Sequence, residues 1–350
     1  MKKIGTAVLG ATGIVGQQFL RMLAGHPIFE LCHLGASAAS AGKSLRDIPW
    51  SLPTPPPERF LEMKLGMSDA AACQTAGAAV VFSALPSEVA AELEPKLAEG
   101  GCRIFSNASA HRLNPSIPLV IPEVNPEHLS LYSQRSKQGM IITNANCVTS
   151  GLALALKPLE PFGLRSIILS TYQAISGAGR RGLSALDSLN NIIPHIASEE
   201  EKIERETEKI FGVLQKDGIV PTSLDVNASC CRVPVRNGHL MNLVVELKID
   251  ASIETVSHTL AKFRGLPQTL GLPTAPREPI LVRKERDRPQ AALDRTAGRP
   301  DRAAGMAVTA GGLRKKKRRF NFSLLVHNTI RGAAGTCILN AELAYAQKLI

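Results

Sequence analysis

The segment VLGATGIVG, residues 8–16, constrains the fold most strongly, because Gly10, Gly13 and Gly16 recur between a strand-like run and a helix-like one. Such glycines allow a tight turn and let the backbone approach a pyrophosphate at the helix N-terminus. The pattern predicts a dinucleotide-binding βαβ unit rather than a plain structural turn. The residues expected to contact the dinucleotide are Gly10, Thr12, Gly13, Ile14, Val15 and Gly16.

Strand and helix signals alternate in the first part of the chain. Strand-like runs cover residues 3–9, 29–34, 78–85 and 102–108, and helix-like segments cover residues 13–24 and 87–100. This order predicts an α/β fold with a parallel, doubly wound sheet of the Rossmann type.

The end of the second strand-like run indicates which dinucleotide is bound. An enzyme that uses NAD usually places an acidic residue there for the ribose hydroxyls. This chain has Ser37, Ser40 and Lys43 instead, with no acid. Hydroxyls and a lysine suit a 2′-phosphate, so we expect NADP as the cofactor.

The character of the sequence changes after residue 147. Long strand-like runs cover residues 164–176, 223–235, 239–249 and 320–327, with polar helical segments expected at 180–196 and 199–211. Residues 265–305 are rich in Pro, Arg and Asp and are expected to form a long surface excursion or part of a subunit contact. The pattern predicts a second, α+β domain built on an antiparallel or mixed sheet.

Charge, cysteine content and hydropathy exclude several protein classes. The net charge is +11, and the run Arg314–Arg319 supplies six of the basic residues. The run has no interleaved aromatic residues and lies between strand-like segments, so a solvated turn is favoured over a nucleic-acid site. The seven cysteines form no CxxC pattern, so neither a disulfide framework nor a metal site is expected. No apolar run is long enough to span a bilayer, and we expect a cytoplasmic enzyme that handles anionic ligands.

Cys147 is the strongest candidate nucleophile. It follows a short apolar, β-branched run and precedes a leucine-rich helix-like segment that ends near Pro161 and Gly163. A thiol in the first turn of a helix faces unpaired N–H groups and the positive end of the helix dipole, which favour the thiolate. The alternative is a small buried hydrophobic residue, which is common for free cysteine.

Two further groups of residues suggest a polar site. Asn237-Gly238 between strand-like runs predicts a hairpin, in which Arg232 and His239 point to the same side of the sheet. They could hold a small substrate at a carboxylate and at a reacting carbonyl, or they could simply belong to a polar surface hairpin. Glu206 and Lys209 share one face of a helical segment and could meet an ammonium and an anion, or form an ordinary charged face.

Taken together, these motifs resemble the aspartate-β-semialdehyde dehydrogenase family, in particular its archaeal and fungal branch. The resemblance covers nearly the whole chain and rests on the segments GATGIVG, GASAASAGKSL, FSALPSEVA, SNASAHRLNPSIPLVIPEVNPEHL, NANC, TYQAISGAGRRG, SLNNIIPHIASEEEKIERETEKIFG, RVPVRNGHL and HNTIRGAAGTCILNAELA. It implies an NADP-binding domain over residues 1–146, to which a C-terminal helix at 330–350 returns. It also implies a catalytic domain over residues 147–329 that dimerises through its sheet, giving a homodimer or a dimer of dimers.

The resemblance also implies residue roles. Cys147 would be the nucleophile and His239 the acid–base catalyst, with Asn146 and Gln173 beside the reacting carbonyl. Substrate and phosphate would meet Arg232 at the α-carboxylate, Glu206 at the amino group, and Arg112 and Lys209 at the phosphate. Further cofactor contacts would come from Ser83, Ser176, Gly177 and Asn328. Ala38 and Ala39 stand where members of the family often carry an arginine, which weakens the expected hold on the 2′-phosphate.

The implied reaction is NADP-dependent reductive dephosphorylation of β-aspartyl phosphate to aspartate β-semialdehyde in lysine, threonine and methionine biosynthesis. Its partners are small molecules, namely aspartate semialdehyde, aspartyl phosphate and phosphate. The alternative within the same chemistry is an acyl-CoA reductase such as malonyl-CoA reductase, which would use the same cysteine and cofactor. A non-catalytic NADP-binding or nucleic-acid-binding protein is disfavoured by the coexistence of Cys147, Gln173, Arg232 and His239.

Overall fold

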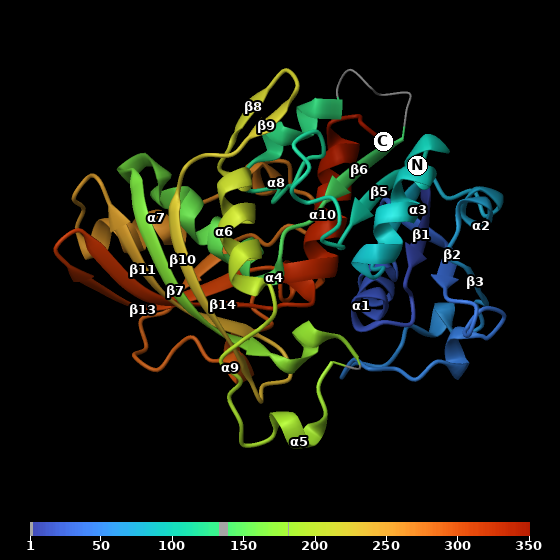
Figure 1. The fold of residues 1–350 in the computed structure, drawn as a ribbon, viewed down its shortest axis with the longest axis horizontal. Coiled ribbons are helices and arrows are strands. Elements are labelled where there is room, and N and C mark those ends of the chain that lie inside the picture. The colour runs from blue at the N-terminus through green and yellow to red at the C-terminus, as the bar shows by residue number, and fades with distance from the viewer. Residues whose placement is uncertain (1–2, 133–138, 181) are drawn as a thin grey trace.

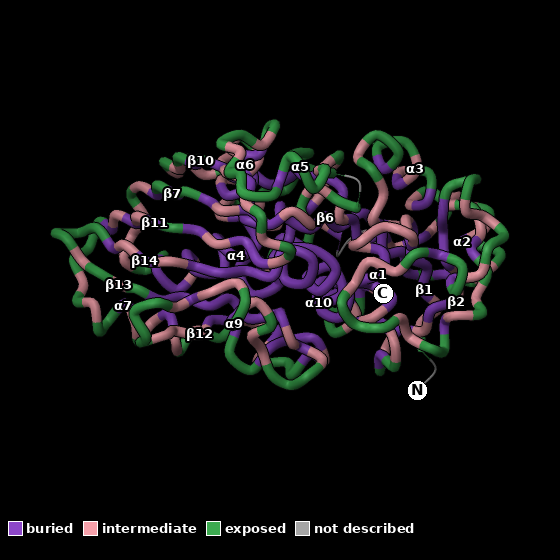
Figure 2. The backbone as a smooth tube through the Cα atoms, turned by 90° about the horizontal axis from the view of Figure 1, so that it is seen from below, coloured by how far each residue is buried: buried purple, intermediate pink, exposed green. Residues whose placement is uncertain are grey.

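The computed structural model describes residues 3–132, 139–180 and 182–350. Two six-stranded sheets lie at opposite ends of an elongated molecule, with helices α4 (Cys147–Leu156), α6 (Glu199–Ile210) and α10 (Gly335–Ala346) between them (Figure 1). The buried backbone concentrates around α4 and α10 at the centre (Figure 2). The expected combination of a doubly wound sheet with a mixed sheet is confirmed.

The first sheet is parallel throughout and has the strand order β3-β2-β1-β4-β5-β6. Its strands are β1 (Ile4–Leu9), β2 (Phe29–Ala36), β3 (Leu65–Met67), β4 (Val80–Ser83), β5 (Arg103–Ser106) and β6 (Met140–Thr143). The order reverses between β1 and β4, and a crevice for a ligand forms at such a point beyond the carboxyl ends of the strands. The predicted parallel sheet and its nucleotide-binding edge therefore follow from the sequence.

Helices cover both faces of this sheet. Alternate strand residues pack to opposite sides: Val8 and Phe82 belong to the core formed with α1 (Ile14–Leu23) and α10, whereas Ala7 and Val81 belong to the core formed with α2 (Ala70–Thr75) and α3 (Ser87–Glu99). Burial on both faces explains why the strands read as continuous apolar runs. The C-terminal helix α10 contributes to the first of these cores.

The second sheet is mixed, with the strand order β10-β7-β11-β14-β13-β12. Its strands are β7 (Leu164–Ala174), β10 (Asp225–Val233), β11 (His239–Leu247), β12 (Ile280–Val282), β13 (Val308–Lys316) and β14 (Arg319–Val326). Helices α4, α6 and α7 (Ile253–Lys262) pack against one face, and the burial of β7 and β11 alternates accordingly. The remaining short elements are a β8–β9 hairpin (Val213–Gln215 and Gly218–Val220), α5 (Ala185–Ser188), α8 (Leu266–Thr269), α9 (Ala291–Asp294) and 3₁₀ or π turns at 45–47, 58–60, 126–132, 157–162, 175–178, 301–303 and 330–334.

The expected hairpin of β10 and β11 is wrong, because β7 lies between these strands and pairs with both. β10 runs parallel to β7 and is reached through α6. The link at 234–238 then crosses the end of β7, where the N–H groups of Ile175 and Ser176 donate to the carbonyls of Val235 and Arg236. A link of five residues spans two strand spacings, which a two-residue turn cannot do.

Three other sequence expectations are corrected. Between residues 180 and 196 the structure has only the single-turn helix α5 among the described residues. The basic run 314–319 is not all turn, because it forms the paired ends of β13 and β14 around Lys317, which has a positive φ. Residues 265–305 are not all surface, since β12 adds a strand to the edge of the second sheet and buries Ile280.

Candidate active site

Cys147 is the first residue of α4, directly after the carboxyl end of β6. Asn146 caps the helix: its Oδ1 accepts from the N–H of Val148 at 2.8 Å and of Thr149 at 3.4 Å. Behind the cysteine, Gly332 leaves no room for a side chain, because a Cβ there would lie 2.7 Å from the Cβ of Cys147. The backbone on both sides therefore holds the thiol in one place.

The effect of the helix start, which was expected to favour the thiolate, is outweighed at this site. Burial and the Glu199 carboxylate raise the pKa of Cys147 to about 12, against the opposing effects of the Arg112 and Arg232 guanidinium groups. Asn146 also occupies two of the N–H groups that would otherwise face an anion. The resting cysteine is therefore a thiol, and ionisation must accompany its reaction.

His239 lies against the sulfur of Cys147, with 3.2 Å between Nε2 and Sγ. Its other ring nitrogen, Nδ1, accepts from the N–H of Ala174 at 3.0 Å. Burial lowers the pKa of His239 to about 3, so the ring is neutral. A neutral ring whose Nδ1 is an acceptor carries its proton on Nε2 and presents it to the sulfur.

Cys147 opens into a cavity of ≈ 690 Å³ between the two sheets. Asn146, Gln173, Arg112 and Arg232, for which the family resemblance implies substrate contacts, line it together with the cysteine. The same cavity also exposes Glu199 and Lys202, near the start of α6, which the sequence analysis did not select. Thiol, amides, guanidinium groups, one carboxylate and one ammonium therefore share one space.

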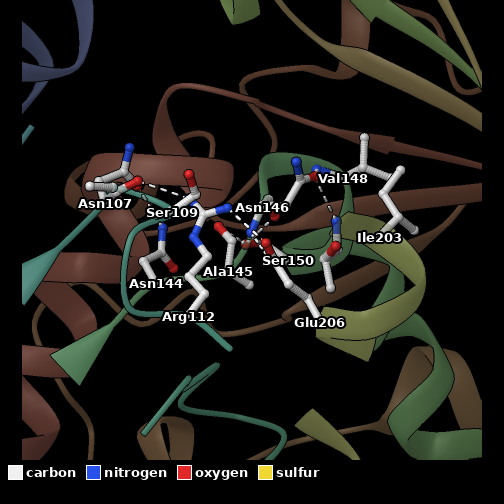
Figure 3. Close-up of polar contacts among 12 residues, drawn as sticks. Asn107, Ser109, Arg112, Asn144, Ala145, Asn146, Val148, Ser150, Ile203 and Glu206 are labelled. Atoms are coloured by element: carbon white, nitrogen blue, oxygen red, sulfur yellow. Dashed lines mark hydrogen bonds and ion pairs between the residues drawn. The ribbon is translucent and has the colours of Figure 1, made fainter. Parts of the chain in front are cut away.

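Glu206 and Lys209 do not line this cavity, so the substrate and phosphate contacts expected of them are corrected. Glu206 accepts from Arg112 Nη1 at 2.9 Å and from the Asn146 N–H at 2.5 Å, and Figure 3 shows it between these two partners. Lys209 donates from Nζ to the carbonyls of Arg112, Asn114 and Ile117 at 2.6–2.7 Å. Both side chains are almost completely buried, and they hold the Arg112 loop and the start of α4 in place.

A signal for the missed residues is present in the sequence. The Glu-x-x-Lys spacing occurs twice on α6, as Glu199 with Lys202 and as Glu206 with Lys209, and the two pairs are seven residues apart. Residues separated by seven share one helix face, so spacing alone does not indicate which pair reaches the cavity. In the structure the first pair, Glu199 and Lys202, lines the cavity.

Glu199 also contacts the two amides that were expected beside the reacting carbonyl. Its Oε1 accepts from Asn146 Nδ2 at 2.9 Å and from Gln173 Nε2 at 3.1 Å. Arg232 donates from Nη1 to the Ala174 carbonyl at 2.9 Å. Arg232 and His239 lie together despite the incorrect hairpin, because a Cβ on Gly177 would lie 2.9 Å from the first and 3.2 Å from the second.

The glycine-rich turn fits a dinucleotide. Gly10 has a φ of +74°, and a Cβ on Gly16 would lie 2.1 Å from the Gly10 carbonyl oxygen. Beside the turn is a second hollow, of ≈ 480 Å³, whose lining includes Thr12, Gly13, Ser37, Ser40 and Lys43. At the other end, Val15, Ser176, Gly177 and Asn328 line the cavity of Cys147, and Asn328 donates to the Ser176 hydroxyl at 2.8 Å. The two hollows thus flank the turn as the two ends of a dinucleotide require.

Ser83 and Ile14 occupy different positions from the other cofactor candidates. Ser83 is completely buried at the end of β4 and lines neither hollow. Ile14 is the first residue of α1, and its neighbours Gly13 and Val15 line the two hollows, but its side chain lines neither. The structure thus gives Ser83 no surface for a cofactor, and any contact of Ile14 rests on its backbone.

Comparison with known proteins places these features in a family. The family model "Semialdehyde dehydrogenase, NAD binding domain" matches residues 5–132, and "Semialdehyde dehydrogenase, dimerisation domain" matches residues 156–331. A curated aspartate-semialdehyde dehydrogenase from Methanothermobacter thermautotrophicus is 46% identical over 97% of this chain and 98% of its own. One from Archaeoglobus fulgidus is 44% identical over 99% and 100%.

The fold agrees with the sequence. The crystal structure of aspartate semialdehyde dehydrogenase with NADP from Candida albicans superposes with a TM-score of 0.91 at 37% identity and covers 100% of both chains. Among the described residues, no helix is long and apolar enough to cross a membrane. The chain belongs to the aspartate-semialdehyde dehydrogenase family.

Proposed function

We propose that this chain reduces β-aspartyl phosphate to aspartate β-semialdehyde, releases phosphate, and catalyses the reverse reaction with NADP. The observation that carries the proposal is the position of Cys147, against His239 and on a cavity that offers both cationic groups and the Glu199 carboxylate. The relatives that match over almost the whole chain carry names specifying aspartate semialdehyde.

The polar groups of the cavity match the substrate. Arg232 provides a fork for the α-carboxylate, and the Glu199 carboxylate receives the α-ammonium. Arg112 and Lys202 provide two cations for the phosphoryl group. These contacts would hold the acyl carbon next to Cys147. The energy of substrate binding is then used to orient the reacting atoms.

The first half of the reaction forms a covalent bond to the cysteine. Sγ of Cys147 attacks the acyl carbon, the carbon–oxygen bond to the phosphoryl group breaks, and the thiol proton leaves with the phosphate. The product is a thioester on Cys147, which accepts hydride more readily than a carboxylate does. The Asn146 and Gln173 amides lie beside this centre, and Glu199 holds both.

The second half reduces the thioester. NADPH would supply the hydride when bound, and Ser176, Gly177 and Asn328 line the space beside Cys147 where they would hold its nicotinamide. His239 donates a hydrogen bond from Nε2 to the oxygen that becomes negative, and to the sulfur as the carbon–sulfur bond breaks, while a proton from solvent restores the thiol. The high pKa of Cys147 then favours reprotonation of the departing sulfur.

The proposed organisation is two domains, at residues 1–146 and 147–329, with residues 330–350 packing on the first. We also propose a homodimer formed through the second sheet. The matched dimerisation family model and the exposed outer face of the sheet support this assembly. The mass of the native protein in solution distinguishes a dimer from a dimer of dimers.

Activity measurements with purified protein test the reaction. Oxidation of aspartate semialdehyde should require NADP and inorganic phosphate together, and arsenate should replace phosphate. Full turnover without an oxyanion, or turnover that requires coenzyme A, would instead support an acyl-CoA reductase. Replacing aspartate semialdehyde by malonate semialdehyde, which lacks the α-ammonium and α-carboxylate, measures how much specificity Glu199 and Arg232 provide.

A further inference from the structure

The hollow beside the glycine-rich turn includes a residue from the other half of the chain. Thr12, Ser37, Ser40 and Lys43 all precede β3, but the same hollow is also lined by Arg180. Arg180 follows β7 and the 3₁₀ turn at 175–178, and Gly179 before it has a φ of +75°. In Figure 1 the chain that follows β7, as far as residue 180, extends toward the loop between β2 and β3.

Specific contacts hold the two segments together at this place. Arg236 donates from Nη2 to the Ser51 carbonyl at 2.7 Å, and its own carbonyl accepts from the Ser176 N–H at 3.2 Å. Gln17 on α1 donates to the Pro49 carbonyl at 3.0 Å and accepts from the Ser51 N–H at 2.7 Å. The loop that carries Arg180 is thus linked through Arg236 to the segment that forms the far wall of the hollow.

The charges that face this hollow favour an anion. Lys43 and Arg180 are exposed cations, and neither forms an ion pair with another residue in the described part of the chain. The one carboxylate in the lining, Asp47, accepts from the Ser44 N–H at 3.2 Å within the short helix that it ends. A ligand therefore meets two cations against one carboxylate, together with the hydroxyls of Ser37 and Ser40.

We infer that Arg180 binds the 2′-phosphate of NADP and, with Lys43, determines the preference for NADP over NAD. The guanidinium supplies from the second domain the fork that Ala38 and Ala39 do not provide in the loop after β2. The inference rests on the use of NADP by this chain. It adds a residue from outside the nucleotide-binding half to the recognition of the cofactor.

Binding of nucleotide fragments tests the inference without turnover. Calorimetric titration of the full-length protein with adenosine 2′,5′-bisphosphate and with 5′-AMP isolates the 2′-phosphate. In Arg180→Ala the affinity for the bisphosphate should fall about 10- to 100-fold, as expected for loss of a charge-assisted pair, with the affinity for 5′-AMP unchanged. Arg180→Lys should retain part of the affinity, because it keeps the charge and loses the fork. Arg277→Ala, an exposed arginine that lines neither site hollow, is the matched control.

Kinetic measurements provide the second readout. In Arg180→Ala, kcat/KM with NADP should fall by the same factor while kcat/KM with NAD stays constant. Equal losses for the bisphosphate and 5′-AMP would mean that Arg180 shapes the hollow without reading the phosphate, and would overturn the inference. An unchanged affinity for the bisphosphate would also overturn it. Wild-type protein that binds the two fragments equally would show that this chain does not read the 2′-phosphate at all, which would refute the premise of NADP preference.

Discussion

At the scale of single residues, the environment of Cys147 decides its chemistry more than its position in the helix does. A helix start lowers the pKa of a thiol by tenths of a unit to a few units, whereas burial in an apolar surrounding raises it. Here burial and Glu199 dominate, and the guanidinium groups of Arg112 and Arg232 oppose them only in part. The balance of these effects therefore favours the thiol form of Cys147 over the thiolate.

Replacing the two central residues should have different consequences. Cys147→Ala should abolish turnover because no other group can carry the acyl intermediate, and Cys147→Ser should be nearly as inactive because a hydroxyl is a far poorer nucleophile. His239→Asn should leave a slow enzyme, reduced about 10²–10⁴-fold, the usual range for loss of general acid–base assistance. Mass spectrometry after incubation with a slow thiol-directed substrate analogue should find the label on the peptide that contains Cys147. Wild-type turnover in Cys147→Ala would refute the assignment; the other six cysteines should tolerate replacement.

The charge of Glu199 should set the pH dependence of Cys147 modification. Glu199→Gln keeps an oxygen acceptor for Asn146 and Gln173 but removes the negative charge, so the pKa of Cys147 should fall. At a pH below both pKa values, each unit of decrease raises the thiolate fraction about tenfold, so alkylation by iodoacetamide should be faster. The rate measured from pH 6 to 10 gives the shift directly. Glu201→Gln, an exposed site on the same helix, should leave the profile unchanged; a profile that also stays unchanged in Glu199→Gln would contradict the electrostatic account.

At the scale of elements, α6 performs two tasks with one repeated pattern. Its first turn presents Glu199 and Lys202 to the cavity, and its later turns bury Glu206 and Lys209 against the segment 112–117. Burial raises the pKa of Glu206 and lowers the pKa of Lys209 to about 8. The hydrogen bonds to Arg112, Asn146 and the three carbonyls offset the cost of burying these charges.

The two lysines of α6 provide a matched pair for testing this division. Lys202→Ala should raise the KM for phosphate about 10- to 100-fold and leave thermal stability unchanged, because a half-buried cation that lines the cavity is lost. Lys209→Ala should lower the free energy of unfolding by about 2–4 kcal/mol, because the carbonyls of Arg112, Asn114 and Ile117 lose the buried ammonium that donates to all three. Denaturant unfolding and steady-state kinetics on both variants distinguish the two roles. If Lys209→Ala raised the KM for phosphate and Lys202→Ala lowered the stability, the phosphate contact would belong to Lys209 instead.

The same element shows how far the sequence could predict the site. The strand–turn–helix at 8–16, the cysteine at a helix start, and the cavity positions of Gln173 and Arg232 follow from local patterns and from resemblance. The sequence could not predict which of the two charged pairs on α6 reaches the cavity, because Glu199 and Glu206 lie on one helix face and differ only in what packs against them. The insertion of β7 between β10 and β11 was equally inaccessible, since Asn237-Gly238 has hairpin composition and only long-range pairing excludes a hairpin.

At the scale of the whole molecule, the site forms where the two sheets face each other. The carboxyl ends of β1, β5 and β6 deliver the glycine-rich turn, Arg112 and Cys147, and the end of β7 delivers Gln173 and the Ser176 turn. Arg331 lies in the π turn before α10 and directly precedes Gly332. It forms an ion pair with Glu123 in which both side chains are completely buried. Catalysis thus depends on the fixed relation of the two halves, which neither half could supply alone.

The outer face of the second sheet should form the subunit interface. Ile168 lies near the middle of β7 and is 51% exposed, beside the outward residues Val244 on β11 and Asn227 on β10. A central exposed isoleucine on a sheet face is a favourable anchor for a second copy, whereas an aspartate there would place two like charges in the interface. Ile168→Asp should therefore convert the proposed dimer into a folded monomer of lower thermal stability.

Light scattering during size-exclusion chromatography measures this change as a halving of the mass. Val213→Asp is the control, because Val213 is 63% exposed on the β8–β9 hairpin, away from the sheet face (Figure 1). The control should keep the wild-type mass. If the wild-type protein has the mass of four chains and Ile168→Asp has the mass of two, this face lies between two dimers and not within one dimer. An unchanged mass in Ile168→Asp would exclude this face from the interface. Circular dichroism on each variant separates loss of association from loss of folding, so that a monomer with an intact spectrum identifies Ile168 as part of the contact.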